Sequence, residues 1–283
     1  MPYQNYLSNY AKSFNWAGFF LSKETYLKCS ALYDFCRIVD NIADDDNPID
    51  YKINEFKKFE NNFNTKNFED PVIKNMWKLI DEFNISLKIV HDLFIGINSD
   101  IKESVKLNTK KDLLIYSYRV AGTVGLMMAK ILEVKKKNSL RSAIDLGIAM
   151  QLTNISRDVT EDLNNGRSYI DESFEEIKST IKLADNFYEN SFYSIKEIPF
   201  RCRFAILVAR RVYRKIGYKI LNMKNLENYR KSGKIYVSNL EKIIETFLSF
   251  FDLIKLLLIN KNDDYIQHDH FLINEKINLD ERI

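Results

Sequence analysis

Glycine and proline are scarce in this chain, with 8 glycines and 4 prolines among 283 residues. Average usage would supply roughly three times as many. Sheet proteins of this length need many tight turns, and those turns depend on glycine and proline. The sequence also lacks the glycine-rich patterns that hold dinucleotides or nucleotide phosphates. These absences argue against all-β and nucleotide-binding folds and favour long helices joined by short connections.

Cysteine and unbalanced charge are also lacking. The three cysteines, Cys29, Cys36 and Cys202, fit no zinc pattern, so we expect a reducing, cytoplasmic compartment. The 42 basic and 39 acidic residues are intermixed, so no nucleic-acid partner is expected. No apolar run approaches the roughly 20 residues of a membrane span, and the stretch at 16–21 is too short for a secretory leader. We therefore expect a soluble protein.

The sequence is rich in apolar residues with helical spacing. Hydrophobic residues make up 46% of the chain and aromatic residues 13%, which is enough for a substantial core. With no repeat or linker, we predict an all-α fold with one domain over residues 1–260 and a polar, loosely held tail over 261–283. Residues 247–259 are interpreted as a core helix, with membrane contact as the alternative. Helices are predicted near residues 23–46, 50–63, 72–83, 86–103, 110–133, 139–163, 172–190, 199–224 and 237–260.

The helix predicted over 23–46 gathers acidic and aromatic residues on one face. At about 100° per residue, Tyr26, Tyr33, Arg37, Asp40 and Asp44 fall within roughly a 60° arc. Two carboxylates one turn apart repel each other, and the repulsion grows when they are buried. A neighbouring cation must offset that cost, either Arg37 or a bound metal ion. A solvated acidic helix end is the alternative, and the aromatic residues on the same arc argue against it.

A second acidic face follows on the helix predicted over 139–163. Gln151, Asn154, Asp158 and Asp162 lie within roughly an 80° arc, on a face that is apolar one to three turns earlier. A purely structural helix would keep its inward face apolar throughout. The change from apolar to acidic suits a ligand with an apolar tail and a metal-bound anionic head.

Carboxylate and amide oxygens favour a hard cation such as Mg²⁺, which keeps phosphate oxygens among its ligands. Mn²⁺ would fit the same donors. His91, His268 and His270 lie outside both acidic faces. Two or three Mg²⁺ ions could bridge a diphosphate and stabilise it as a leaving group, so that an allylic carbocation forms. An apolar, aromatic cavity would protect that cation from water.

These residues resemble the squalene/phytoene synthase family of head-to-head prenyltransferases. The resemblance rests on separate blocks that run from about residue 10 to 242. They are KSFNWAGFFL at 12–21, LYDFCRIVDNIAD at 32–44, YSYRVAGTVGLMM at 116–128 and QLTNISRDVTEDLNNGRSY at 151–169, with weaker matches at 209–217 and 234–237. The family implies an all-α isoprenoid-synthase bundle with a central cavity between the two acidic motifs.

The resemblance also implies roles for individual residues. Asp40, Asp44, Asn154, Asp158 and Asp162 match the metal ligands. Tyr116 and Tyr213 match tyrosines that face the reacting centre. Taken alone, both would be interpreted as core aromatics, and Gly122, Gly125 and Gly147 as helix-packing glycines. The positions that hold diphosphate or order the site are Ser13, Tyr33, Arg37, Gln151, Arg157, Lys234 and Lys242, and the positions that line the prenyl channel are Val120, Ala121, Val124, Gly125 and Met128.

Two positions depart from the family pattern. Residue 41 is Asn where an aspartate is usual, which weakens the first acidic cluster, and the proline usual after Tyr169 is missing. The resemblance implies a Mg²⁺-dependent condensation of two geranylgeranyl diphosphates to phytoene through a cyclopropyl diphosphate, without NADPH. The alternatives are a squalene or dehydrosqualene synthase using farnesyl diphosphate, and a non-catalytic assembly factor of the same family. Because the product is lipophilic, loose membrane contact through residues 247–259 is expected. The oligomeric state is left open.

Overall fold

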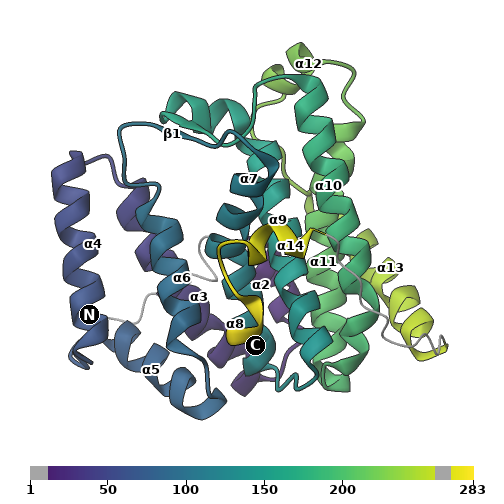
Figure 1. Ribbon diagram of the computed structural model, residues 1–283. Coiled ribbons are helices and arrows are strands. Elements are labelled where there is room, and N and C mark those ends of the chain that lie inside the picture. Colours follow the sequence, from purple (N-terminus) through teal and green to yellow (C-terminus); the bar gives the residue numbers. More distant parts are fainter. Residues whose placement is uncertain (1–11, 259–268) are drawn as a thin grey trace.

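The computed structural model describes residues 12–258 and 269–283, and of residues 12 and 13 only the backbone. It is an all-α bundle, as predicted (Figure 1). The α-helices are α2 (Lys12–Gly18), α3 (Lys23–Asp44), α4 (Ile49–Asn64), α5 (Pro71–Phe83), α6 (Leu87–Asn98), α7 (Lys110–Ser117), α8 (Thr123–Ile131), α9 (Lys137–Asn164), α10 (Phe174–Phe192), α11 (Phe200–Leu221), α12 (Leu226–Lys231), α13 (Asn239–Leu258) and α14 (His270–Asn274).

Side-chain caps set many of the helix starts. Ser22, Asp70, Ser86, Thr109 and Ser173 each accept a hydrogen bond from a backbone N–H two or three residues further on. Such caps satisfy donors that the first helical turn leaves unpaired. Local sequence therefore fixes these helix starts, which is why the predicted boundaries agree with the structure to within a few residues.

Helix α9 forms the centre of the bundle and packs against α8, α10 and α11. In Figure 1 it lies behind α7 and α14, with α3 to α6 on one side and α10, α11 and α13 on the other. Its buried residues occur around the whole helix and include Ile144, Ile148, Leu152, Ile155 and Val159. A helix covered on most sides is held by packing rather than by propensity, so its side chains are positioned firmly.

The structure adds features that periodicity does not predict. The predicted helix over 110–133 is α7, a π-helical turn (Tyr118–Gly122) and α8 in succession, and the one over 86–103 ends at Asn98. Two short strands, β1 (Val105–Lys106) and β2 (Arg167–Ser168), pair in parallel. Short 3₁₀ helices follow α10 and α14, at Tyr193–Glu197 and Leu279–Glu281. Pro199 is the residue before α11, close to the predicted first turn.

The prediction of a loosely held C-terminal tail is wrong for residues 269–283. These residues cross the front of the molecule, and α14 packs against α7 (Figure 1). Ile273, Ile277 and Leu279 are buried. Charged residues fix the segment as well, because Arg282 donates to Asp92. The error arises because these buried residues are set among polar ones and give little periodic signal, although each one fills a site on the bundle.

The interpretation of residues 247–259 as a core helix is also wrong over its described part, up to Leu258. Phe247, Phe250 and Phe251 of α13 are more than half exposed. The hydrophobic pattern is that of an amphipathic helix, but its apolar side faces solvent. Among the described residues, no helix is long and apolar enough to cross a membrane.

Candidate active site

The first acidic motif lies on the last two turns of α3. Arg37 donates to Asp40 at 2.9 Å, which offsets part of the repulsion between Asp40 and Asp44. Burial, followed by the charge of Asp44, raises the pKa of Asp40 to about 6. Tyr33, one turn before Arg37, is half-buried on the same side of the helix. The structure thus brings the predicted residues of this motif together.

The second acidic motif lies on the last three turns of α9. Arg157 donates to both oxygens of Asp158, at 2.8 and 2.5 Å, and Lys234 lies 3.7 Å from the same carboxylate. Asp162 forms no ion pair or side-chain hydrogen bond among the described residues. Burial, followed by the charge of Asp158, raises the pKa of Asp162 to about 7. The side-chain oxygen of Asn154 is buried and also has no partner among those residues.

Arg167 of β2 lies between the two motifs. It donates to Asp44 at 2.7 Å and to the carbonyl oxygen of Ala43 at 3.0 Å. Its charge also lowers the pKa of Asp40 and of Asp162, which belong to different motifs. The gap lined by Asp162, Arg167 and neighbouring side chains at this point, where the resemblance predicts a central cavity, is too narrow for a water molecule. The ends of α3 and α9 therefore face each other across one guanidinium.

A buried cluster of two tyrosines and one carboxylate lies beside Arg167. Tyr116 donates to Asp100 at 2.7 Å, and Tyr169 donates to the other oxygen of Asp100 at 2.9 Å. The two rings stack with centroids 4.7 Å apart. Burial raises the pKa of Asp100 to about 6 and the pKa of Tyr116 well above its usual value. Both hydroxyls therefore keep their protons and remain donors at neutral pH.

Tyr213 of α11 lies on the α2 side of the acidic motifs. Its ring contacts Phe14 with centroids 4.9 Å apart, and Phe14 also approaches Tyr33 at 6.4 Å. Burial raises the pKa of Tyr213, and the charge of Arg157 lowers it, so the phenol lies near the second motif. Aromatic rings from three helices therefore surround the space next to the acids.

The predicted channel residues share one face of the π-helical turn and α8. Val120, Ala121, Val124, Gly125 and Met128 are all half-buried, while most of their neighbours on the same helices are fully buried. A set of partly accessible apolar side chains inside a bundle is the arrangement an apolar channel requires.

Gly125 and Gly147 also allow close helix packing. A Cβ at Gly125 would lie 2.2 Å from the carbonyl oxygen of Ala143, and one at Gly147 would lie 2.2 Å from that of Ala121. Backbones of α8 and the π-helical turn therefore touch α9 directly. The packing explanation for these glycines holds, whereas a channel role for Gly125 stays a prediction.

Other predicted residues lie further from the acids. Lys242 of α13 is buried, with its amino group 6.0 Å from the centre of the Trp16 ring. Gln151 lies one turn from Asn154, whose amide nitrogen approaches it at 3.5 Å. Ser13 is in α2, and its side chain lies outside the described residues, as does His268. His270 forms a hydrogen bond with Asp145 at 2.6 Å, which helps to hold the C-terminal segment against the bundle.

The donor set of the two motifs suits a hard cation such as Mg²⁺. All candidate ligands are carboxylate or amide oxygens, and the buried Asn154 oxygen without a partner is in position to accept one more interaction. Within 12–258 and 269–283, no three acidic, histidine or cysteine side chains converge tightly enough to hold an ion by themselves. Instead, Arg167 contacts Asp44 and Arg157 contacts Asp158, and these two arginines supply the positive charge beside the acids.

Sequence reasoning missed Asp100, Arg167 and Tyr169 as candidate site residues. Arg167 and Tyr169 lie inside the block at 151–169, so a signal for them was present. Asp100 follows α6 in an irregular segment and shares no spacing with the motifs. Only the packing of α6 against the π-helical turn brings it to Tyr116.

The fold and site together define an all-α protein in which two acidic helix ends meet beside aromatic and apolar side chains. The sequence model of the squalene/phytoene synthase family matches residues 7–176, and the chain belongs to this family. The predicted family and the all-α isoprenoid-synthase fold are therefore confirmed. Enzymes of this family are prenyltransferases that process prenyl diphosphates with the help of metal ions.

Curated relatives and a solved structure agree with this assignment. The chain is 29% identical over 243 residues to 15-cis-phytoene synthase of Enterobacter agglomerans, covering 75% of this chain and 82% of the relative. It is 30% identical over 263 residues to 4,4'-diapophytoene synthase of Staphylococcus haemolyticus, covering 83% and 90%. A dehydrosqualene synthase solved in complex with a ligand superposes with a TM-score of 0.75 at 28% identity, covering 88% and 94%.

Proposed function

We propose that this chain is a phytoene synthase, which condenses two geranylgeranyl diphosphates head to head. The observation that carries the proposal is the meeting of the two acidic motifs beside an apolar helix face, in a chain whose curated relatives include several phytoene synthases. The reaction forms the first hydrocarbon of carotenoid biosynthesis. All four motif aspartates are present, which opposes the alternative of a non-catalytic assembly factor.

In the proposed reaction, one substrate first loses its diphosphate. The C1 cation of its prenyl chain is then attacked by the double bond of the second substrate. Loss of a proton closes the cyclopropyl diphosphate. Departure of the second diphosphate, rearrangement and loss of another proton then give phytoene. Two substrates thus yield one hydrocarbon, two diphosphates and two protons, so no reductant is needed.

The chain's own residues divide this work. Asp40, Asp44, Asn154, Asp158 and Asp162 would hold two or three Mg²⁺ ions, which neutralise the leaving diphosphate when bound. Arg157 and Lys234 contact Asp158 and would bind diphosphate oxygens beside it.

Aromatic and apolar side chains would protect the carbocation. Tyr116 and Tyr213 would present their rings to the cationic carbon, and burial favours the neutral phenol in both. The face of Val120, Ala121, Val124 and Met128 would hold the prenyl tails and exclude water.

A product assay tests the proposal. The purified chain is incubated with Mg²⁺ and either geranylgeranyl or farnesyl diphosphate, and the hydrocarbon is identified by mass spectrometry. A C40 hydrocarbon from the C20 substrate is expected. A C30 hydrocarbon from farnesyl diphosphate alone would support the second candidate, a dehydrosqualene synthase, which the staphylococcal relative and the ligand-bound neighbour favour. No product from either substrate with folded protein would contradict both.

The lipophilic product also leads us to propose a cytoplasmic protein in loose contact with the inner face of the membrane. The exposed apolar residues of α13 support such contact.

A further inference from the structure

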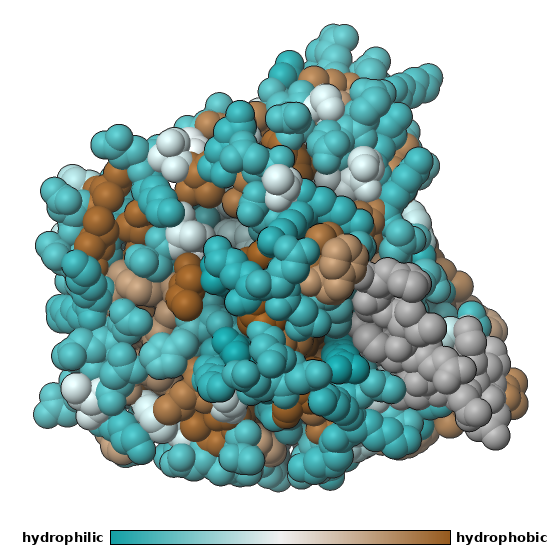
Figure 2. All heavy atoms as spheres, viewed as in Figure 1, coloured by the Kyte–Doolittle hydropathy of each residue, from teal (hydrophilic) through white to brown (hydrophobic). Residues whose placement is uncertain are grey.

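Helix α13 presents the opposite of the usual amphipathic arrangement. Its buried residues are Lys242, Glu245, Ser249 and Leu256, whereas nine apolar residues from Leu240 to Leu258 are exposed. Phe247, Phe250 and Phe251 alone expose roughly 300 Å². The whole face therefore exceeds the few hundred Å² of apolar patch that monomeric proteins commonly expose. In Figure 2 only a few hydrophobic residues are visible at the right-hand edge, where α13 lies, and the front face is mostly hydrophilic.

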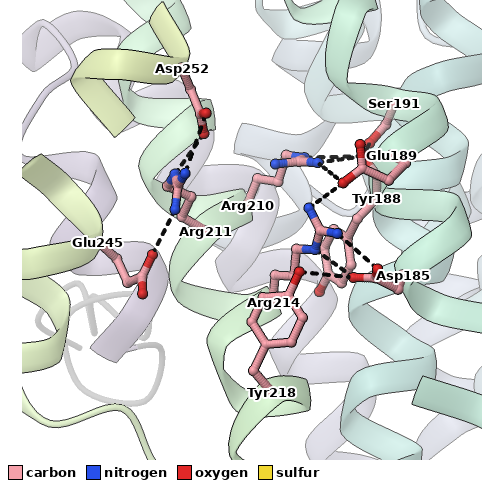
Figure 3. A network of polar contacts seen from close by, with 10 residues as sticks. All are labelled: Asp185, Tyr188, Glu189, Ser191, Arg210, Arg211, Arg214, Tyr218, Glu245 and Asp252. Atoms are coloured by element: carbon pink, nitrogen blue, oxygen red, sulfur yellow. Dashed lines mark hydrogen bonds and ion pairs between the residues drawn. The ribbon is translucent and has the colours of Figure 1, made fainter. Parts of the chain in front are cut away.

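Ion pairs hold α13 in this orientation. Arg211 of α11 donates to Asp252 at 2.6 Å and to Glu245 at 3.0 Å (Figure 3). Lys219 contacts Glu241 at 2.9 Å. Rotating the helix to bury its apolar face would break these pairs and leave charges buried without partners. The exposed apolar face is thus a fixed feature of the fold.

A cationic pocket opens on one flank of α13. Its volume is about 230 Å³, and it lies between α10, α11 and α13. Four cations line it, namely Arg210, Arg211, Arg214 and Lys255, against three acids. Lys255 forms no ion pair among the described residues and lies over the rings of Phe192 and Tyr193. The three arginines are paired with acids of α10 and α13, so Lys255 supplies the positive charge on this flank that can receive an anion.

The apolar face also connects with the candidate active site. Trp16 of α2 donates to Thr246 of α13 at 2.9 Å. Two residues earlier in α2, Phe14 contacts Tyr213. Helix α2 thus joins the exposed helix to the aromatic wall beside the acidic motifs, and a hydrocarbon leaving that wall would meet α13.

We propose that α13 lies flat on a lipid bilayer, with its exposed face among the acyl chains and the phosphate of an anionic lipid headgroup in the pocket beside Lys255. The arrangement matches interfacial helices, which combine an apolar face rich in Phe and Leu with cations at headgroup level. The inference deepens the proposed function and rests on it for the choice of lipid over another partner, because substrates and product of that reaction carry long hydrocarbon chains.

Vesicle sedimentation tests the proposal. The full chain, without substrate, is mixed with sucrose-loaded vesicles of phosphatidylcholine alone or with phosphatidylglycerol. We expect binding that is stronger to the anionic vesicles. The double variant Phe247→Glu/Phe251→Glu should bind at least about tenfold more weakly. Lys255→Gln should bind anionic vesicles about fivefold more weakly, which corresponds to about 1 kcal/mol for one cation at such a surface.

Matched controls separate this role from general effects of charge. Phe68, before α5, is also exposed, and in Figure 1 α5 lies on the side of the molecule opposite α13. Lys178 lies over the Phe174 ring much as Lys255 lies over Phe192. Phe68→Glu and Lys178→Gln should bind vesicles as the unchanged chain does. If a control variant lost as much vesicle binding as the α13 variant it is matched to, the proposal would be overturned.

Light scattering tests the competing occupant, a second copy of the chain. A dimer that Phe247→Glu/Phe251→Glu converts to monomer, together with no vesicle binding, would overturn the proposal. The product assay with detergent-dispersed substrate distinguishes failure of the membrane proposal from failure of the proposed enzymatic function. Hydrocarbon formation without vesicle binding would overturn only the membrane surface, and vesicle binding without hydrocarbon would overturn only the proposed function.

Discussion

Helices α9 and α13 both direct acidic side chains into the protein, but they leave those acids in different states. Glu245 and Asp252 of α13 are both paired with Arg211, and Glu245 also lies 3.6 Å from Lys215. Asp162 of α9 has no ion pair within the described part of the chain, and its pKa is raised to about 7 by burial. The inward acids of α13 are paired within the protein, while α9 leaves Asp162 without a partner among the described residues and available to a ligand.

The difference shows which feature of an inward polar face indicates a site. Hydrophobic periodicity alone cannot separate the two cases, because it records where polar residues lie on a helix and not whether they have partners. Asp162 and the buried Asn154 oxygen lack partners, and a bound cation would remove that cost. On α13 the paired acids orient the helix and expose its apolar side. Incomplete pairing, rather than inward polarity, separates a binding site from a structural network.

The largest expected effect comes from removing an acid that a ligand needs. Asp158→Ala should lower turnover at least roughly 10²-fold, because an electrostatic stabiliser of the leaving group is lost. Helix content by circular dichroism should be unchanged, since Asp158 lies at a partly exposed helix end. Product formation with Mg²⁺ is the measurement.

Asp171→Ala is the matched control, because Asp171 is an exposed acid seven residues beyond the end of α9. Its turnover should equal that of the unchanged chain. Full activity in Asp158→Ala would show that the second motif does not hold the metal ions.

A smaller loss is expected where an acid positions a tyrosine. Asp100 accepts from Tyr116, and Asp92, on α6, accepts from Tyr118 at 3.1 Å. Replacing either acid by Asn removes one charged acceptor and should lower the melting temperature. Only Asp100→Asn should also lower kcat, by roughly tenfold, because only Tyr116 lies beside the acidic motifs.

The variants Asp100→Asn and Asp92→Asn compare an acid near the acidic motifs with one distant from them. Measuring kcat and KM for both variants distinguishes a positioning role from lost stability. Equal kcat in the two variants would mean that the Asp100 cluster is purely structural.

Sequence predicted the two acidic faces because their residues repeat one turn apart on single helices, so no tertiary information was needed. Asp100 could not be found in this way, since its role depends on a hydrogen bond to Tyr116, 16 residues further along the chain. The direction of α13 escaped for the same reason, because Arg211 on another helix decides which side faces inward. Helix caps and residue spacing can be predicted from the sequence, whereas ion pairs between helices cannot.

The raised pKa values also predict how stability depends on pH in the metal-free chain. Asp40 and Asp162 have folded pKa values of about 6 and about 7, above the ordinary 3.8. Between pH 4 and 7 the folded state therefore holds more protons than the unfolded state, and stability falls as pH rises through this window. Melting temperatures recorded across it should decline, and adding Mg²⁺ should restore more stability at pH 8 than at pH 5.

The variant Asp162→Asn isolates the contribution of Asp162 to the pH dependence of stability. Its melting temperature should vary less with pH than that of the unchanged chain, because Asn does not titrate. An identical slope in the two proteins would show that Asp162 is not the group held protonated by burial.

The smallest effect is expected on the paired side of the comparison. Glu245→Gln removes one charge from the Arg211 network and should lower the free energy of unfolding by about 1–2 kcal/mol. The exposed pair of Glu175 and Lys178 provides a control, and Glu175→Gln should change stability by less than about 0.5 kcal/mol. Urea titration followed by circular dichroism measures both. If Glu245→Gln proved as mild as Glu175→Gln, ion pairing would not be what orients α13, and its exposed apolar face would need another cause.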